Sequence, residues 1–258
     1  MKVEVDGESI EVVREGNGPV IVFVHFLGGF SYQWRNQFAA LKDRYTCIAY
    51  DHRGFGHSSF NNGHWDVPTG ADELKGVLDA LGVERAHVVG YSMGGPVALV
   101  FNARWPDRVR SLTLIDTFAK NHTHSQARIE ESEKCLRYMS MREYARQYVA
   151  TRFLLDTPQA MVDELVSSIC LARKGAYLDV LRGILLPDFT EYCAQVKVPT
   201  LVMCGRHDHT TPVAFTNDLT RLIASAVEKI IPTGHLGVFD DPKAFNAPMI
   251  EFLDAQPR

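Results

Sequence analysis

A chain of 258 residues, 46% of them hydrophobic, can bury a large core and falls within the length of a single α/β unit with an insertion. Its 27 lysines and arginines against 31 aspartates and glutamates give a formal net charge of −4, which provides no basic footprint for nucleic acid. Because no run approaches the roughly 18 apolar residues of a membrane span and the N-terminal residues lack the apolar core of a signal peptide, we expect a cytoplasmic protein that binds neither nucleic acid nor a membrane.

The cysteines and histidines give no indication of a metal centre. The five cysteines are odd in number, and their spacing matches neither a disulfide framework nor a zinc site. His207 and His209 flank Asp208, but alternate residues on a turn point apart and no further ligand spacing accompanies them. We therefore expect neither a metal ion nor a cofactor.

Short apolar runs alternate with amphipathic segments along most of the chain. In chain order, strands are predicted at 3–5, 10–13, 20–24, 45–50, 86–91, 109–115, 200–204 and 227–231. Helices are predicted near 33–41, from Thr69 or Asp72 to about 81, and at 97–103, 212–224 and 242–253. Strands that alternate with helices of this length predict an α/β fold with a mostly parallel sheet covered on both faces.

This alternation stops between residues 118 and 192. No buried strand pattern occurs there, and helical patterns are found instead at 129–139, 141–153, 158–172 and 176–185. We interpret 118–192 as a helical lid inserted into one core domain that comprises residues 1–117 and 193–258.

The segment 90–94 reads GYSMG and lies between a predicted strand and a predicted helix. In this context a G-x-S-x-G sequence indicates a sharp turn that strains the serine backbone and exposes its hydroxyl. The free N–H groups of the following helix then point toward any negative charge that forms beside Ser92. The alternative interpretation is a glycine-rich turn with an incidental serine.

Two further residues complete a chemical arrangement around Ser92. A serine is a weak nucleophile unless a base removes its proton and a third group orients the base. His235 follows the last predicted strand and Asp208 follows the one before it, so both lie where sites form in such sheets. The order Ser92, Asp208, His235 predicts a catalytic triad. Asp116, at the end of the strand before the insertion, is the competing candidate for the acid.

These features resemble the α/β-hydrolase superfamily. The resemblance is carried by residues 25–29, the DHRGFGHS loop at 51–58, the turn at 90–94, and segments 205–208 and 234–235. It implies an α/β-hydrolase fold, with a mostly parallel eight-stranded sheet flanked by helices and a helical lid after the sixth strand. Among the members of the superfamily, the chain is most similar to small bacterial esterases, 3-oxoadipate enol-lactonases and cofactor-free haloperoxidase-like hydrolases.

The resemblance also implies an oxyanion hole formed by the backbone N–H groups of Leu27 and Met93. The family usually has His-Gly where this chain has His25 followed by Phe26, a departure that affects the loop carrying the first donor. The candidates for substrate-binding residues are Phe26, whose ring would point into the pocket, and Trp34, which follows the oxyanion loop.

We therefore expect a serine hydrolase that cleaves a small-molecule carboxylic ester or lactone through an acyl-enzyme. Carbon–carbon bond hydrolysis of a ring-cleavage diketone and cofactor-free perhydrolysis would use the same triad and are the alternative activities. A ligand receptor that keeps the triad but signals through lid closure is the alternative from another class.

Overall fold

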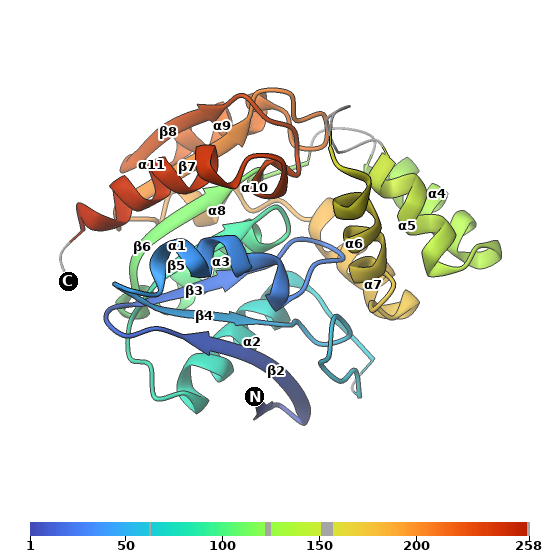
Figure 1. Ribbon diagram of the computed structural model, residues 1–258, viewed down its shortest axis with the longest axis horizontal. Helices are drawn as coiled ribbons and strands as arrows, with labels where there is room; N and C mark the ends of the chain where they lie inside the picture. Colours follow the sequence, from blue (N-terminus) through green and yellow to red (C-terminus); the bar gives the residue numbers. More distant parts are fainter. Residues whose placement is uncertain (62, 122–124, 151–156, 257–258) are drawn as a thin grey trace.

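The computed structural model describes residues 1–61, 63–121, 125–150 and 157–256. An eight-stranded sheet runs through the molecule in the order β1-β2-β4-β3-β5-β6-β7-β8 (Figure 1). The strands are β1 (Lys2–Val5), β2 (Glu8–Glu15), β3 (Val20–Val24), β4 (Thr46–Tyr50), β5 (Ala86–Tyr91), β6 (Val109–Ile115), β7 (Thr200–Gly205) and β8 (Ala226–Ile231). Only the β1–β2 and β2–β4 pairs are antiparallel, so the predicted mostly parallel sheet is confirmed.

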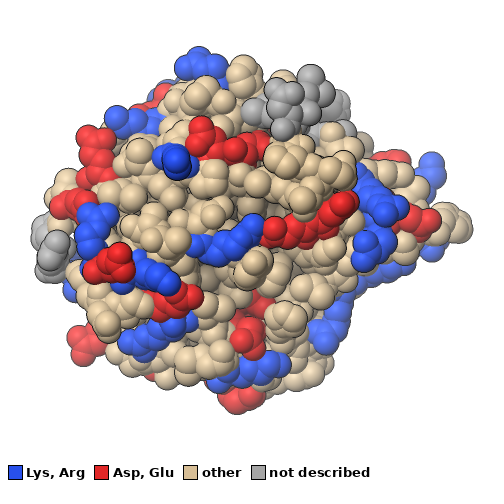
Figure 2. All heavy atoms as spheres, viewed as in Figure 1, with Lys and Arg blue, Asp and Glu red and all other residues tan. Residues whose placement is uncertain are grey.

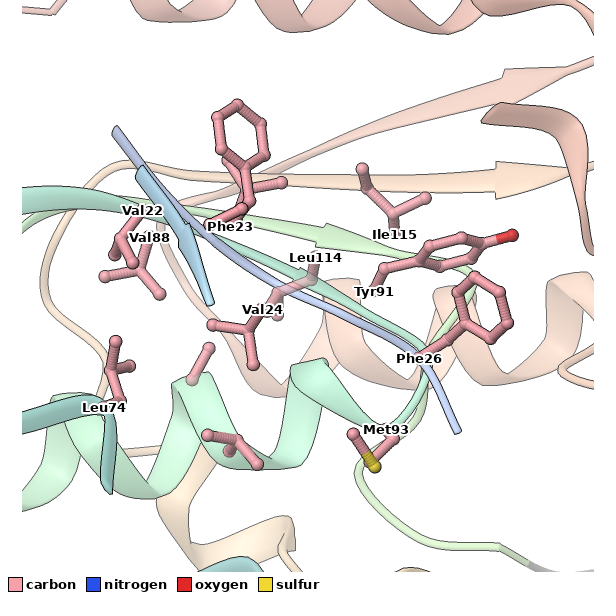
Figure 3. Close-up of a cluster of buried hydrophobic side chains, with 14 of the residues drawn as sticks. Val22, Phe23, Val24, Phe26, Leu74, Val88, Tyr91, Met93, Leu114 and Ile115 are labelled. Atoms are coloured by element: carbon pink, nitrogen blue, oxygen red, sulfur yellow. The ribbon is translucent and has the colours of Figure 1, made fainter. Parts of the chain in front are cut away.

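Helices cover both faces of this sheet. They are α1 (Arg35–Leu41), α2 (Val67–Ala80), α3 (Gly94–Arg104), α9 (Val213–Leu222) and α11 (Pro242–Asp254), with the short helices η1 (Ser31–Trp34), η2 (Pro106–Arg108) and α10 (Gly237–Asp240). Side chains alternate between the two faces of a strand. In β3, Phe23 packs against Phe38 of α1, whereas Val24 lies against Gly94 of α3. Figure 3 shows Phe23 on the opposite side of the strand from Val22 and Val24.

Helix α2 begins earlier than the apolar periodicity predicts. Its first residue is Val67, not Thr69 or Asp72, because the Asp66 carboxylate caps the helix by accepting a hydrogen bond from the Thr69 N–H at 2.7 Å. Pro68 fits the first turn, where a helix loses no hydrogen bond to proline. The sequence signal for the start of α2 was therefore Asp66 followed by Pro68, which lies before the segment with apolar periodicity.

The described residues between β6 and β7 are helical, as predicted. They form α4 (Ser125–Tyr138), α5 (Met141–Ala150), α6 (Gln159–Ile169), α7 (Lys174–Leu185) and α8 (Thr190–Cys193), and the first four group beside the sheet in Figure 1. Residues 151–153 of the second predicted helix lie outside the described residues. The segment's ends are joined, because the Phe189 N–H donates to the Ala119 carbonyl at 2.8 Å and Lys120 pairs with Asp188 at 2.7 Å.

The strand register brings distant residues to one edge. Val24 pairs with Gly90, Tyr91 with Ile115, Ile115 with Met203, and Gly205 with Ile231, so β3, β5, β6, β7 and β8 all end at this edge. The segments that follow them contain all the candidate catalytic residues. Parallel pairing thus places them together before any side-chain contact is considered.

The surface carries mixed charge. On the face shown in Figure 2, lysine and arginine side chains are interspersed with aspartate and glutamate, and neither sign forms a continuous field. Within the described part of the chain, no helix is both long enough and apolar enough to cross a bilayer.

Close packing at the start of α3 generates a test of the fold. A Cβ at Gly94 would lie 2.3 Å from the Val24 carbonyl oxygen, so Gly94→Ala should lower the free energy of unfolding by about 1–3 kcal/mol. The matched control is Gly175→Ala in α7, where the nearest atom is 4.0 Å away and the change should be neutral or slightly stabilising. Urea unfolding of both variants would measure this difference, and equal stabilities would contradict it.

Candidate active site

Ser92 lies in the turn between β5 and α3, with its backbone in the left-handed region at φ +51°. Such a conformation costs on the order of 1–3 kcal/mol and persists only when surrounding contacts impose it. Here the Ser92 N–H donates to the Ile115 carbonyl at 2.8 Å, and the Thr117 hydroxyl donates to the Ser92 carbonyl at 2.6 Å. A Cβ at Gly90 would lie 2.3 Å from the Gly94 carbonyl oxygen, so glycine is required where strand and helix cross.

His235 and Asp208 form a buried hydrogen-bonded pair. The His235 Nδ1 lies 2.7 Å from Asp208 Oδ2, and the Tyr91 hydroxyl donates to the His235 carbonyl. Asp208 Oδ1 accepts from the N–H groups of Thr210 and Thr211 at 2.7 and 2.9 Å, and the Thr211 hydroxyl donates to Oδ2 at 2.5 Å. These contacts hold the imidazole at one orientation and leave Nε2 facing away from the acid.

The environment of Asp208 favours its ionised form. Burial by itself would raise the pKa of this carboxyl, but the charge interaction with His235 and the hydrogen bonds from His235 and Thr211 lower it below its ordinary value. Asp208 is therefore a carboxylate at neutral pH, as an orienting acid must be.

Asp116 lies close to this pair but has a different environment. Its Oδ1 accepts a hydrogen bond from the Gly205 N–H at 2.7 Å, and one of its oxygens lies within 4.8 Å of an Asp208 oxygen. Burial, followed by repulsion from Asp208, raises the pKa of Asp116 well above its ordinary value. Of the two candidate acids, Asp208 contacts the histidine, whereas the surroundings of Asp116 favour its protonated form.

Ser92 and the Asp208 loop face one cavity of about 410 Å³. Leu27 lines it beside Ser92, and Thr211, 3.2 Å from His235 Nδ1, lines it from the acid's loop. The buried His235 Nε2 hydrogen-bonds to no described residue. Such open geometry is common before substrate binds, since catalytic hydrogen bonds tighten in the substrate complex.

Two backbone N–H groups are available beside Ser92. Leu27 and Met93 both follow strand ends, and neither N–H donates a hydrogen bond to a described residue. Leu27 is followed by Gly28, whose left-handed backbone at φ +84° turns the chain toward η1. Two unpaired N–H groups at the ends of β3 and β5 can together bind an oxyanion.

Phe26 and Trp34 occupy positions that differ from the sequence-based expectation. Phe26 is buried with its ring centroid 5.0 Å from that of Tyr91, and Figure 3 shows the two rings beside one another. Trp34 packs 4.9 Å from Phe23 in the core. Neither residue lines the cavity beside Ser92, because both side chains are taken up by aromatic packing behind it.

The outer wall of the cavity comes from the segment between β6 and β7. Helix α4 contributes polar side chains at helical spacing, namely Arg128, Glu131, Ser132 and Cys135. Helix α5 adds Tyr144, Gln147 and Tyr148, and α7 contributes the apolar side chains of Leu181, Ile184 and Leu185. None of these α4 residues was predicted to line the site, although their i, i+3, i+4, i+7 spacing indicates one face of a helix. Thr211, which donates to Asp208, was not predicted either, although an Asp-x-x-Thr turn pattern favours such a hydrogen bond.

Comparisons with known proteins identify the family of the chain. A family model described as the alpha/beta hydrolase fold matches residues 19–174. Among curated proteins, 3-oxoadipate enol-lactonase 1 of Acinetobacter baylyi is 28% identical over 239 residues, which cover 92% of this chain and 89% of that protein.

Solved structures show the same likeness over nearly the entire chain. The enol-lactonase from Burkholderia xenovorans LB400 has a TM-score of 0.91 at 25% identity, covering 98% of this chain and 100% of that one. A thermophilic esterase from Thermogutta terrifontis, solved with malate bound, has a TM-score of 0.90 at 25% identity and covers 98% of both chains. The family model matches more than half of the residues, and the sheet, the serine turn and the relatives agree: the chain belongs to the alpha/beta-hydrolase-fold family and is a hydrolase.

Proposed function

We propose that the protein is a serine hydrolase that cleaves a small carboxylic ester or lactone through an acyl-enzyme. The observation that carries this proposal is the buried His235–Asp208 pair, whose hydrogen-bond partner Thr211 lines the same cavity as the strained, backbone-fixed Ser92. The similarity to an enol-lactonase and an esterase supports the choice of substrate class.

The arrangement accounts for each proton transfer. His235 Nε2 accepts the Ser92 proton as the hydroxyl oxygen attacks the carbonyl carbon, while Asp208 stabilises the imidazolium through Nδ1. The carbonyl oxygen becomes an oxyanion that the N–H groups of Leu27 and Met93 bind. His235 then protonates the leaving alcohol, and a water molecule repeats the sequence on the acyl-enzyme to release the acid and regenerate Ser92.

The cavity supports a substrate of limited size with one apolar and one polar part. Its volume of about 410 Å³ is near the lower end of small-molecule sites, which span roughly 300–1,000 Å³. Leu181 and Ile184 of α7 form an apolar wall, and Arg128 and Glu131 of α4 contribute charged groups to the lining. In this proposal residues 118–192 form a lid over the site.

Ser92→Ala is the direct test of the nucleophile. Because the hydroxyl is the attacking group, the variant should lose about 10⁶-fold in kcat toward whichever substrate the unsubstituted protein accepts. The assay is a panel of p-nitrophenyl esters of graded acyl length together with enol-lactones, with a covalent serine probe as second readout. Full activity in the Ser92→Ala variant would overturn the proposal. So would labelling of a serine other than Ser92 by the probe in this variant.

The two neighbouring carboxyls provide a matched comparison for the acid. Asp208→Asn should lower kcat by about 10⁴-fold, because an amide can no longer hold the required imidazole tautomer. Asp116→Asn, which keeps an oxygen for the Gly205 N–H, should retain kcat within about tenfold. Steady-state kinetics on both variants decide the assignment, and the reverse order of effects would move the acid to Asp116.

The raised pKa of Asp116 predicts how stability depends on pH. The folded protein keeps a proton that the unfolded chain releases above about pH 4, so this residue lowers the free energy of unfolding as pH rises from there through the folded-state pKa. Asp116→Asn has no such proton. Its stability relative to the unsubstituted protein should therefore increase with pH, measured by urea unfolding between about pH 5 and pH 8.

The control for this series is Asp79→Asn in α2. The pKa of Asp79 is lowered below its ordinary value despite partial burial, since Lys75 and Arg108 hydrogen-bond to its carboxylate. Asp79 and both partners keep their charges above about pH 5, so the stability difference of this variant should stay constant over the same range. A flat difference for Asp116→Asn as well would show that Asp116 is ionised in the folded protein.

A further inference from the structure

We propose that Glu73 is a positioning residue for the oxyanion hole: through His52 and His25 it fixes the peptide that presents the Leu27 N–H. This inference rests on the proposed function, since it assigns the Leu27 N–H to oxyanion binding. It adds a residue on α2 and a buried chain of hydrogen bonds that links it to the site.

The first step is the peptide between Phe26 and Leu27. Its carbonyl oxygen accepts two hydrogen bonds, from His25 Nδ1 at 2.8 Å and from the Gly29 N–H at 2.8 Å. A trans peptide is planar, with its C=O and N–H groups pointing in opposite directions. Two donors on the carbonyl of Phe26 therefore fix the direction of the Leu27 N–H.

The second step is the tautomer of His25. The His52 N–H donates to His25 Nε2 at 3.0 Å, so Nε2 carries a lone pair and the proton is on Nδ1, where it is donated to Phe26. Burial, together with the nearby His52, lowers the pKa of His25 well below its ordinary value, so the ring stays neutral. The backbone of residue 52 thereby selects the tautomer that the oxyanion peptide requires.

The third step is the carboxylate that holds residues 52 and 53. Glu73 Oε1 lies 2.6 Å from His52 Nδ1 and Oε2 lies 2.7 Å from Arg53 Nε, all on buried side chains. The Arg53 N–H also donates to this carboxylate, at 3.3 Å to each oxygen. The carboxylate thus binds donors on two consecutive residues, which fixes both the strand end after β4 and the N–H that His25 accepts.

Aromatic packing confines the same rings. His25 lies edge-on to His52 with centroids 4.9 Å apart, and Trp65 also packs edge-on against His52, at 5.6 Å. A buried ion pair contributes little net stability compared with apolar side chains of similar volume. The connection of this pair to the oxyanion peptide through His52 and His25 points to orientation as its role.

The test compares His25→Ala and Glu73→Gln with the rescue variant His25→Asn. Displacing one oxyanion donor should lower kcat by about 10²-fold in His25→Ala, with KM changed by no more than about twofold. Glu73→Gln should show the same pattern at about tenfold, because an amide retains one acceptor but loses its charge. The short amide of His25→Asn can still donate to the Phe26 carbonyl, so it should recover most of kcat.

Two further measurements separate positioning from a structural role. The dissociation constant of a trifluoromethyl ketone, which forms an oxyanion on Ser92, should rise in proportion to the loss of kcat/KM in every variant. The matched control is Glu8→Gln, which removes another buried carboxylate, one that accepts hydrogen bonds from the Ser59 hydroxyl and the Asn61 N–H, and it should leave kcat unchanged. Thermal unfolding of all variants shows which of them are folded at the assay temperature.

The outcomes are distinct. Normal kcat in folded His25→Ala or Glu73→Gln, or a loss that Glu8→Gln shares equally, overturns the positioning role while leaving the triad intact. If His25→Ala does not fold, the comparison of His25→Asn with Glu73→Gln decides in the same way. Full activity in Ser92→Ala would instead remove the proposed function itself.

Discussion

The contact between the end of β5 and the start of α3 constrains the rest of the site. The strand and helix are so close that a side chain at Gly90 would strike the backbone of Gly94, and one at Gly94 would strike the backbone of β3. This close crossing, together with the hydrogen bonds that Ser92 makes to Ile115 and Thr117, holds Ser92 in the left-handed region. The sheet around the crossing is buried on both faces, so the strained turn has no room to relax.

Electrostatics then separates two carboxyl groups that have the same chemistry. Asp208 is surrounded by N–H and O–H donors and a histidine, whereas Asp116 has one N–H donor and a negatively charged neighbour. Two carboxylates this close cannot both be ionised at low cost in a buried site. The environment, not the residue type, therefore decides which of them can stabilise a positive imidazole.

Much of this could be predicted from the sequence, and the misses have physical causes. Apolar runs and, in the N-terminal hairpin, alternating residues identified the strands, and the order of Ser92, Asp208 and His235 along the chain predicted residues that the parallel register brings to one edge. Phe26 and Trp34 were expected in the pocket, but which way an aromatic ring turns depends on partners distant in the sequence, such as Tyr91 and Phe23. In α4 the i, i+3, i+4, i+7 spacing places the lining residues on one face, but which face of the helix meets the cavity depends on how the helix packs.

The join between Ala119 and Phe189 has a consequence for how such an enzyme can change. A backbone hydrogen bond and the Lys120–Asp188 ion pair join the two ends of the inserted segment. The distance between the end of β6 and the start of β7 therefore does not depend on the length of the chain between them. A change in length there adds only a small loop-closure entropy. A segment of another length can therefore replace this one if it keeps the contacts of α6 with the core, where the Ser168 hydroxyl donates to the Gly28 carbonyl and Glu164 pairs with Arg35.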